Sequence, residues 1–205
     1  SNNIVVKKLV NEKSMQRFEA VIDALSENME DIFYYEYEDI EGSVVSGLKM
    51  KSWILLGAAT EVVLQVFLSI YIEDYQSANW QQWEKFSERE VKNAIFDTLN
   101  KLIEEGKIKK EYVRSIKEAV RDEIKYHVKV HPVEKVMLDE IISFYEKNEI
   151  LDQKDIEVLR SIQKNRNCIH AYMDRDIGLW SDFQYCIRFF CALLETLTFR
   201  MPEEV

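Results

Sequence analysis

Trp53–Tyr71 reads WILLGAATEVVLQVFLSIY, which is the most apolar segment of the chain. A run of this length is almost sufficient to span a bilayer, so a membrane helix has to be weighed against a buried one. Glu61 and Gln65 stand four residues apart at its centre, where a carboxylate would be costly in a membrane. No strongly basic flank marks a cytoplasmic side. We therefore expect the central helix of a water-soluble bundle, and no membrane partner.

The segments on either side of this run carry the apolar spacing of amphipathic helices, and none shows the alternation of a strand. A helical stripe extends from Met15 to Phe33. The capping box Ser87–Glu90 precedes another helical pattern, which Gly106 ends. Because the chain has only 5 Gly and 2 Pro, turns are sparse and long helices are favoured. The sequence predicts an all-α, multi-helix bundle.

The composition limits the classes of function that fit the chain. With 205 residues, 47% of them hydrophobic and 31% charged, the chain has the size and apolar content of one globular domain, or of one domain with a helical appendage. Its net charge of -10 disfavours a surface that coats nucleic acid along its whole length. A focal basic site is still compatible with this charge.

The cysteines and histidines give no sign of a metal or disulfide framework. There are three Cys, an odd number clustered late in the chain, at positions 168, 186 and 191. The three His, at positions 127, 131 and 170, lack the spacing of known metal motifs. We expect no metal and no other cofactor. No signal-peptide pattern opens the sequence, and we expect a reducing, cytoplasmic location.

Lys164–Tyr172 reads KNRNCIHAY and concentrates cations, amides and an imidazole in a few residues. In a helix Arg166 and His170 would project from one face, because they are four residues apart. On an acidic protein this local reversal of charge is where we would expect a phosphate to bind. The alternative is a structural ion pair between Arg166 and a carboxylate of a neighbouring helix. Glu61 is the expected partner, since an acid in the apolar central helix needs one.

The order of these elements resembles HEPN-like helical domains over roughly residues 50–199. The resemblance rests on four pieces of sequence, namely LLGAATE at 55–61, LDEII at 138–142, LR at 159–160 and RNCIH at 166–170. HEPN domains are helical bundles that usually dimerise, so the resemblance implies a homodimer. It also implies an N-terminal helical extension at residues 1–43 and a HEPN-like bundle domain at residues 44–205.

In catalytic HEPN domains an Arg, a polar residue and a His converge across the dimer interface and cut RNA without a metal. By resemblance, Arg166 would bind the phosphate, Asn167 would be the polar residue and His170 the catalytic histidine, with Glu61 and Tyr172 in support. The histidine would move the proton as a ribose 2′-OH attacks the adjacent phosphate. The implied function is an RNA-directed, metal-independent endoribonuclease of a toxin or anti-phage defence system, with an antitoxin or another protein as partner.

The chain departs from the family pattern in the spacing of the motif. Catalytic members leave four to six residues between Arg and His, whereas this chain leaves three between Arg166 and His170. Packing or RNA contact is therefore an alternative role for His170. The alternative function is a non-catalytic helical dimerisation or interaction module, in which Arg166 and His170 form a structural polar cluster with Glu61. It predicts that these side chains are satisfied within one subunit.

Overall fold

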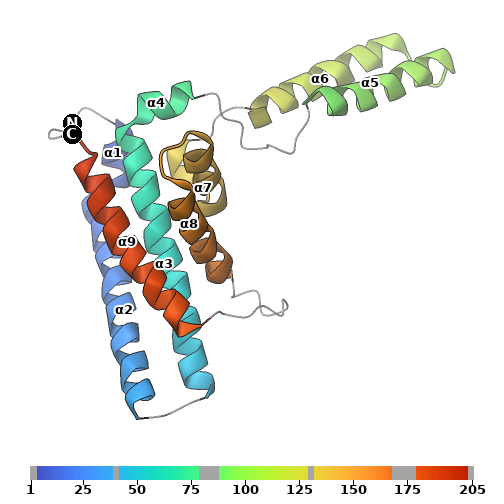
Figure 1. Cartoon of the computed structure of the whole chain (residues 1–205). Coiled ribbons are helices and arrows are strands. Elements are labelled where there is room, and N and C mark those ends of the chain that lie inside the picture. Colours follow the sequence, from blue (N-terminus) through green and yellow to red (C-terminus); the bar gives the residue numbers. More distant parts are fainter. Residues whose placement is uncertain (1–3, 39–41, 79–87, 129–131, 168–178, 203–205) are drawn as a thin grey trace. The chain divides into compact units, whose positions relative to one another are not determined.

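A computed structural model describes residues 4–38, 42–78, 88–128, 132–167 and 179–202. Within these ranges the chain forms nine α-helices and one 3-10 turn, and it contains no strand (Figure 1). The predicted all-α class is therefore confirmed. The chain folds into two compact units. We call Ser1–Ala78 with Pro132–Val205 the helical body, and Asn79–His131 the hairpin.

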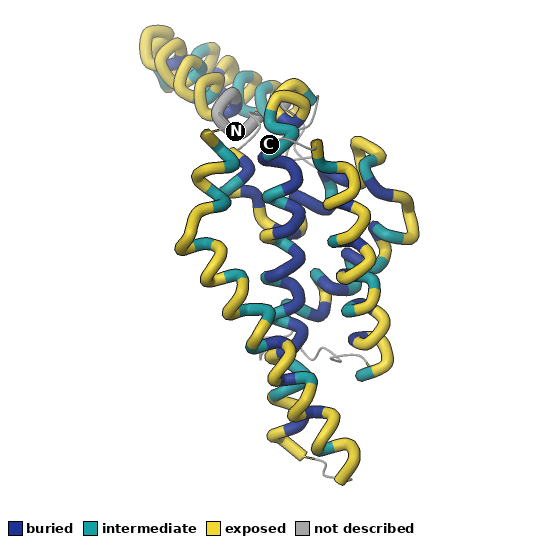
Figure 2. The backbone as a smooth tube through the Cα atoms, turned by 90° about the vertical axis from the view of Figure 1, so that its left-hand side faces the viewer, coloured by how far each residue is buried: buried dark blue, intermediate teal, exposed yellow. Residues whose placement is uncertain are grey.

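Helix α3 (Ser43–Ile70) is the central helix of the helical body. It packs against α2 (Glu12–Tyr37), α7 (Leu138–Lys147), α8 (Gln153–Arg166) and α9 (Trp180–Phe199), as Figure 1 shows. In Figure 2 the buried residues form a column through the middle of this unit. Because neighbours surround α3, its sequence is apolar on nearly every side. The predicted role of its apolar run as the core of a bundle is confirmed.

Helix α3 is also long and apolar enough to cross a membrane, by length and composition alone. Half of its most apolar window is buried against the other helices of the body. Core helices of bundles and single membrane spans share this length and composition, so neither assigns the chain to a compartment.

Local signals in the sequence set several helix ends. The backbone N–H of Ser14 donates to Oδ1 of Asn11 over 3.1 Å, which caps the start of α2. Gly42 precedes α3 with a φ of 138°, a backbone conformation that other residues rarely adopt. Asp152 caps α8 by accepting the N–H of Asp155 over 2.9 Å.

Two helical segments differ from what their local sequence predicts. The pattern at residues 73–86 predicts a polar turn, but residues 72–77 form α4 (Ile72–Ser77). The reason is Tyr75, which is buried with its ring centroid 4.9 Å from that of Phe144. Pro132 predicts the start of the following helix, but α7 begins only at Leu138, after a 3-10 turn (Val133–Lys135) and an extended Met137.

The N-terminal helices pack against the helices that follow residue 43. Helices α1 (Ile4–Leu9) and α2 belong to the same unit as α3. Leu25 and Ile32 of α2 are buried, and Asn28 donates from Nδ2 to the carbonyl of Leu48 on α3 over 3.2 Å. Helix α2 is therefore part of the core, whereas α1 contacts α3 without a buried residue of its own.

The hairpin consists of α5 (Glu88–Glu104) and α6 (Lys110–Val128). Its turn depends on Gly106, whose φ of 68° is left-handed. The backbone N–H of Gly106 donates to the carbonyl of Ile103 and that of Lys107 to the carbonyl of Leu102, each over 2.9 Å, which closes the last turn of α5. The prediction that Gly106 ends this helix is confirmed. The two helices bury Leu99, Val113 and Ile124.

Candidate functional site

The candidate site lies at the C-terminal end of α8, where Arg166 is the last helical residue. Its aliphatic stem crosses α3 at Gly57. A Cβ atom placed on Gly57 would lie 2.6 to 2.8 Å from Cβ, Cγ and Cδ of Arg166. Since non-bonded carbon atoms do not approach so closely, only glycine at this position allows α8 to cross α3 as it does.

The guanidinium of Arg166 reaches Glu61, which lies one turn beyond Gly57 on α3. Nη1 donates to Oε2 of Glu61 over 2.5 Å. The side chains of Arg166 and Glu61 are 28% and 23% exposed, so water still reaches both. The ion pair that the sequence predicts between Glu61 and Arg166 is confirmed.

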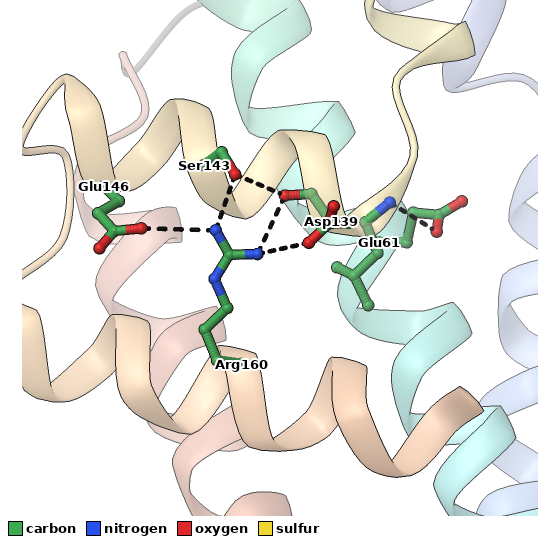
Figure 3. Close-up of polar contacts among 6 residues, drawn as sticks. Glu61, Asp139, Ser143, Glu146 and Arg160 are labelled. Atoms are coloured by element: carbon green, nitrogen blue, oxygen red, sulfur yellow. Dashed lines mark hydrogen bonds and ion pairs between the residues drawn. The ribbon is translucent and has the colours of Figure 1, made fainter. Parts of the chain in front are cut away.

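The same carboxylate oxygen also binds the start of α7. Oε2 of Glu61 accepts the backbone N–H of Leu138 over 3.2 Å, as the right-hand side of Figure 3 shows. This N–H belongs to the first turn of a helix, where backbone donors lack a partner within the helix and negative charge is stabilising. Gln65 donates from Nε2 to the carbonyl of Val136 over 2.8 Å. One face of α3 therefore holds the start of α7 and the end of α8.

The guanidinium of Arg166 has donors to spare, as a comparison with Arg160 of the same helix shows. Nη1 of Arg160 donates to the carbonyl and Oδ1 of Asp139 over 3.2 and 2.7 Å, and Nη2 donates to Oγ of Ser143 and Oε2 of Glu146 over 2.7 and 3.4 Å (Figure 3). Among the residues that the structure describes, Arg166 makes only its bond to Glu61. An arginine has five N–H donors.

The remaining predicted site residues follow Arg166 along the chain. Asn167 is the C-cap of α8 and is half-buried, and its backbone N–H donates to the carbonyl of Asn165. His170 and Tyr172 lie outside the described residues. The prediction that Arg166 and His170 share one helical face is therefore untested.

A feature that the sequence reasoning missed is the packing of the start of α9 on α3. Trp53 lies one turn before Gly57 on α3 and packs edge-on against Phe183 of α9, with ring centroids 5.0 Å apart. Trp180, at the start of α9, stacks on Phe183 with ring centroids 4.6 Å apart. Since residues 53, 57 and 61 are spaced by four, one face of α3 contacts both the end of α8 and the start of α9.

Burial shifts the pKa of two side chains in the core of the helical body. Burial raises the pKa of the Cys186 thiol to about 11, so this thiol is a poor nucleophile at neutral pH. Burial also raises the pKa of Tyr145, whose hydroxyl donates to the carbonyl of Leu64 over 2.9 Å. Both groups are part of the core. In the described part of the chain, no three His, Cys, Asp or Glu side chains gather as metal ligands would.

Comparison with known proteins gives this chain no relative. No family model, no curated protein and no solved structure matches its sequence or its fold. The resemblance to HEPN-like domains is therefore a prediction that rests on the residues of this chain alone.

Proposed function

We propose that the chain is an RNA-directed, HEPN-like protein that cleaves RNA without a metal ion, at a site formed by Arg166, Asn167 and His170. The observation that carries the proposal concerns the side chain of Arg166. It is held in place by Glu61, it is partly exposed, and among the described residues only one of its N–H donors is hydrogen-bonded. Gly57 and Glu61 fix it four residues before the histidine. A guanidinium that is already oriented binds a phosphate with little reorganisation.

In this reaction His170 removes the proton of a ribose 2′-OH as the oxygen attacks the adjacent phosphorus. The bond from phosphorus to the 5′-oxygen breaks, and that oxygen leaves with a proton. The products are a 2′,3′-cyclic phosphate and a 5′-hydroxyl. Arg166 stabilises the negative charge on the phosphoryl oxygens, and Glu61 acts through Arg166 as a positioning residue. In a homodimer, the second subunit supplies a second histidine as the acid.

One observation favours the alternative, a non-catalytic dimerisation or interaction module. Glu61 neutralises Arg166 within a single subunit, and the stem of Arg166 is packed on Gly57. In this role the pair fastens α8 to α3, and no RNA is cut. If the chain is a ribonuclease, loss of Arg166 abolishes RNA cleavage. If it is an interaction module, loss of Arg166 lowers the stability of the bundle and there is no cleavage to lose.

The test is incubation of a mixed RNA pool with the purified protein in EDTA, beside the variant Arg166→Ala/His170→Ala. The proposal predicts 2′,3′-cyclic phosphate ends from the wild type and none from the variant. The urea midpoint of both proteins is measured in parallel. Absence of cleavage by the wild type, with a large loss of stability in the variant, would reject the ribonuclease and favour the interaction module.

A further inference from the structure

The hairpin has the opposite charge balance from the rest of the chain. Residues 79–131 contain 12 of the 27 Lys and Arg but only 10 of the 37 Asp and Glu, so the acidic excess lies entirely outside them. On α6 the basic residues Lys110, Arg114, Lys117 and Arg121 are spaced by four, three and four. This spacing places them along one face of the helix, over about 16 Å. We call these four residues the basic stripe.

Contacts with α5 hold the C-terminal half of the basic stripe, Lys117 and Arg121, in place. Nζ of Lys117 donates to Oδ1 of Asn100 over 2.8 Å and lies 5.1 Å from the ring centroid of Phe96. The guanidinium carbon of Arg121 lies 5.2 Å from the same ring. Phe96 and Asn100 are one turn apart on α5, so two cations are ordered side by side by an aromatic ring and an amide. Neither contact cancels their charge.

The N-terminal half of the basic stripe, Lys110 and Arg114, is more open to water. Arg114 donates from Nε to Glu118 over 3.1 Å, but the two side chains are 83% and 55% exposed. A pair this exposed contributes little and is readily replaced by another anion. Lys110, in the first turn of α6, is also exposed.

We propose that the basic stripe binds the phosphate backbone of RNA, and thereby holds the substrate of the proposed ribonuclease site. This inference rests on the proposed function. A row of cations at each helical turn suits a polymer with a regularly repeated negative charge. Because the remaining residues are strongly acidic, the hairpin is where the charge of the chain favours a polyanion.

The apolar side of α6 argues for RNA over an anionic membrane. A helix that lies on a membrane exposes a broad apolar face beside its cations. Here Val113 and Ile124 of α6 are buried together with Leu99 of α5, and the exposed large apolar side chains of α6 are only Tyr112 and Ile116 among the described residues, at 56% and 38%. What the basic stripe presents to solvent is charge, one aromatic ring and one amide.

The test is the salt dependence of binding of the full chain to fluorescein-labelled 2′-O-methyl polyuridylate, measured by anisotropy. This probe lacks the 2′-hydroxyl and cannot be cut by the proposed reaction. The variants are Lys117→Gln/Arg121→Gln and Lys110→Gln/Arg114→Gln, of which the second leaves Phe96 and Asn100 with their partners. The control Lys13→Gln/Lys154→Gln removes the same charge from exposed positions of the helical body.

We expect each stripe variant to lower the slope of log affinity against log salt by about 1.4, since each cation paired with a single-stranded phosphate adds about 0.7. The control keeps the wild-type slope, and circular dichroism of all three variants matches that of the wild type. An unchanged slope in both stripe variants, or an equal fall in the control, overturns the inference. The inference is also overturned if the stripe variants lose binding to phosphatidylserine vesicles while their binding to RNA stays at the wild-type level.

The two proposals fail separately. If the wild type does not cut RNA but its binding slope falls in the stripe variants, the basic stripe stands as an RNA-binding surface and the ribonuclease is rejected. If the wild type cuts RNA and the slope is unaffected, the ribonuclease stands and the basic stripe is rejected.

Discussion

Helix α8 carries two arginines whose side chains are almost equally exposed, at 32% for Arg160 and 28% for Arg166. Arg160 uses both terminal nitrogens on α7, in four hydrogen bonds, whereas Arg166 uses one nitrogen on α3. Exposure alone would give them one role. The number of engaged donors separates them, because an arginine with four of its five donors engaged fastens helices and one with a single engaged donor can still bind an anion.

The largest effect is expected from Gly57→Ala, which tests whether the stem of Arg166 needs the glycine. The added methyl group would overlap Cβ, Cγ and Cδ of Arg166, and we expect a loss of about 1–3 kcal/mol in the free energy of unfolding, measured in urea. The control is Gly47→Ala in the same helix, where no atom lies within 4 Å of the added group. It should gain up to about 1 kcal/mol from helix propensity. Equal stability of the two variants would contradict the close crossing.

Replacing one acceptor of each arginine gives the next largest effect. Glu61→Ala leaves both the guanidinium of Arg166 and the N–H of Leu138 without their acceptor, so we expect a loss of about 1–3 kcal/mol. Asp139→Ala removes a carboxylate that is 66% exposed and should cost less than about 1 kcal/mol. Urea unfolding of both variants tests the order, and a larger loss in Asp139→Ala would reverse our assignment of the two clusters.

Lysine in place of each arginine sharpens the comparison further. An ammonium group cannot span the acceptors on both sides of Arg160, so Arg160→Lys should cost about 1 kcal/mol. Arg166→Lys can keep one bond to Glu61, and we expect it to cost only a few tenths of a kcal/mol. A greater loss for Arg166→Lys would mean that residues outside the described ranges already engage the other donors of Arg166.

The pairing of Glu61 with Arg166 was predictable because the apolar run contains a single acid, which needs a partner, and because residues 164–172 concentrate cations. Gly57 was not recognised, since a glycine inside a helix is ordinarily only a weakness and its use depends on which helix crosses there. The acceptors of Arg160 share one face of α7, but the sequence does not reveal that α8 packs on that face. The separate hairpin was missed for the same reason, because the packing of helices against one another defines it.

The smallest effect on stability is expected from the surface pair of Lys8 and Glu134, with which the contributions of Arg160 and Arg166 can be compared. Lys8 hydrogen-bonds Glu134, and this bond lowers the pKa of the Glu134 carboxyl from its ordinary value. The stabilisation is therefore present above the ordinary carboxyl pKa and is lost as the pH falls through the lowered one. We expect Lys8→Ala to reduce the difference between the urea midpoints at neutral and acid pH, and high salt to reduce it in the wild type. Identical pH profiles would show that the pair contributes nothing.

The most direct test of the proposed site is the rate of RNA cleavage in EDTA by Arg166→Ala and Arg160→Ala, both measured where each variant is folded. We predict that Arg166→Ala lowers the rate constant by about 10²–10³-fold, as the loss of a group that stabilises transition-state charge would. Arg160→Ala should cleave at nearly the wild-type rate. Equal rates in the two variants, or no cleavage by the wild type, would contradict the claim that Arg166 is a phosphate-binding residue of a ribonuclease site.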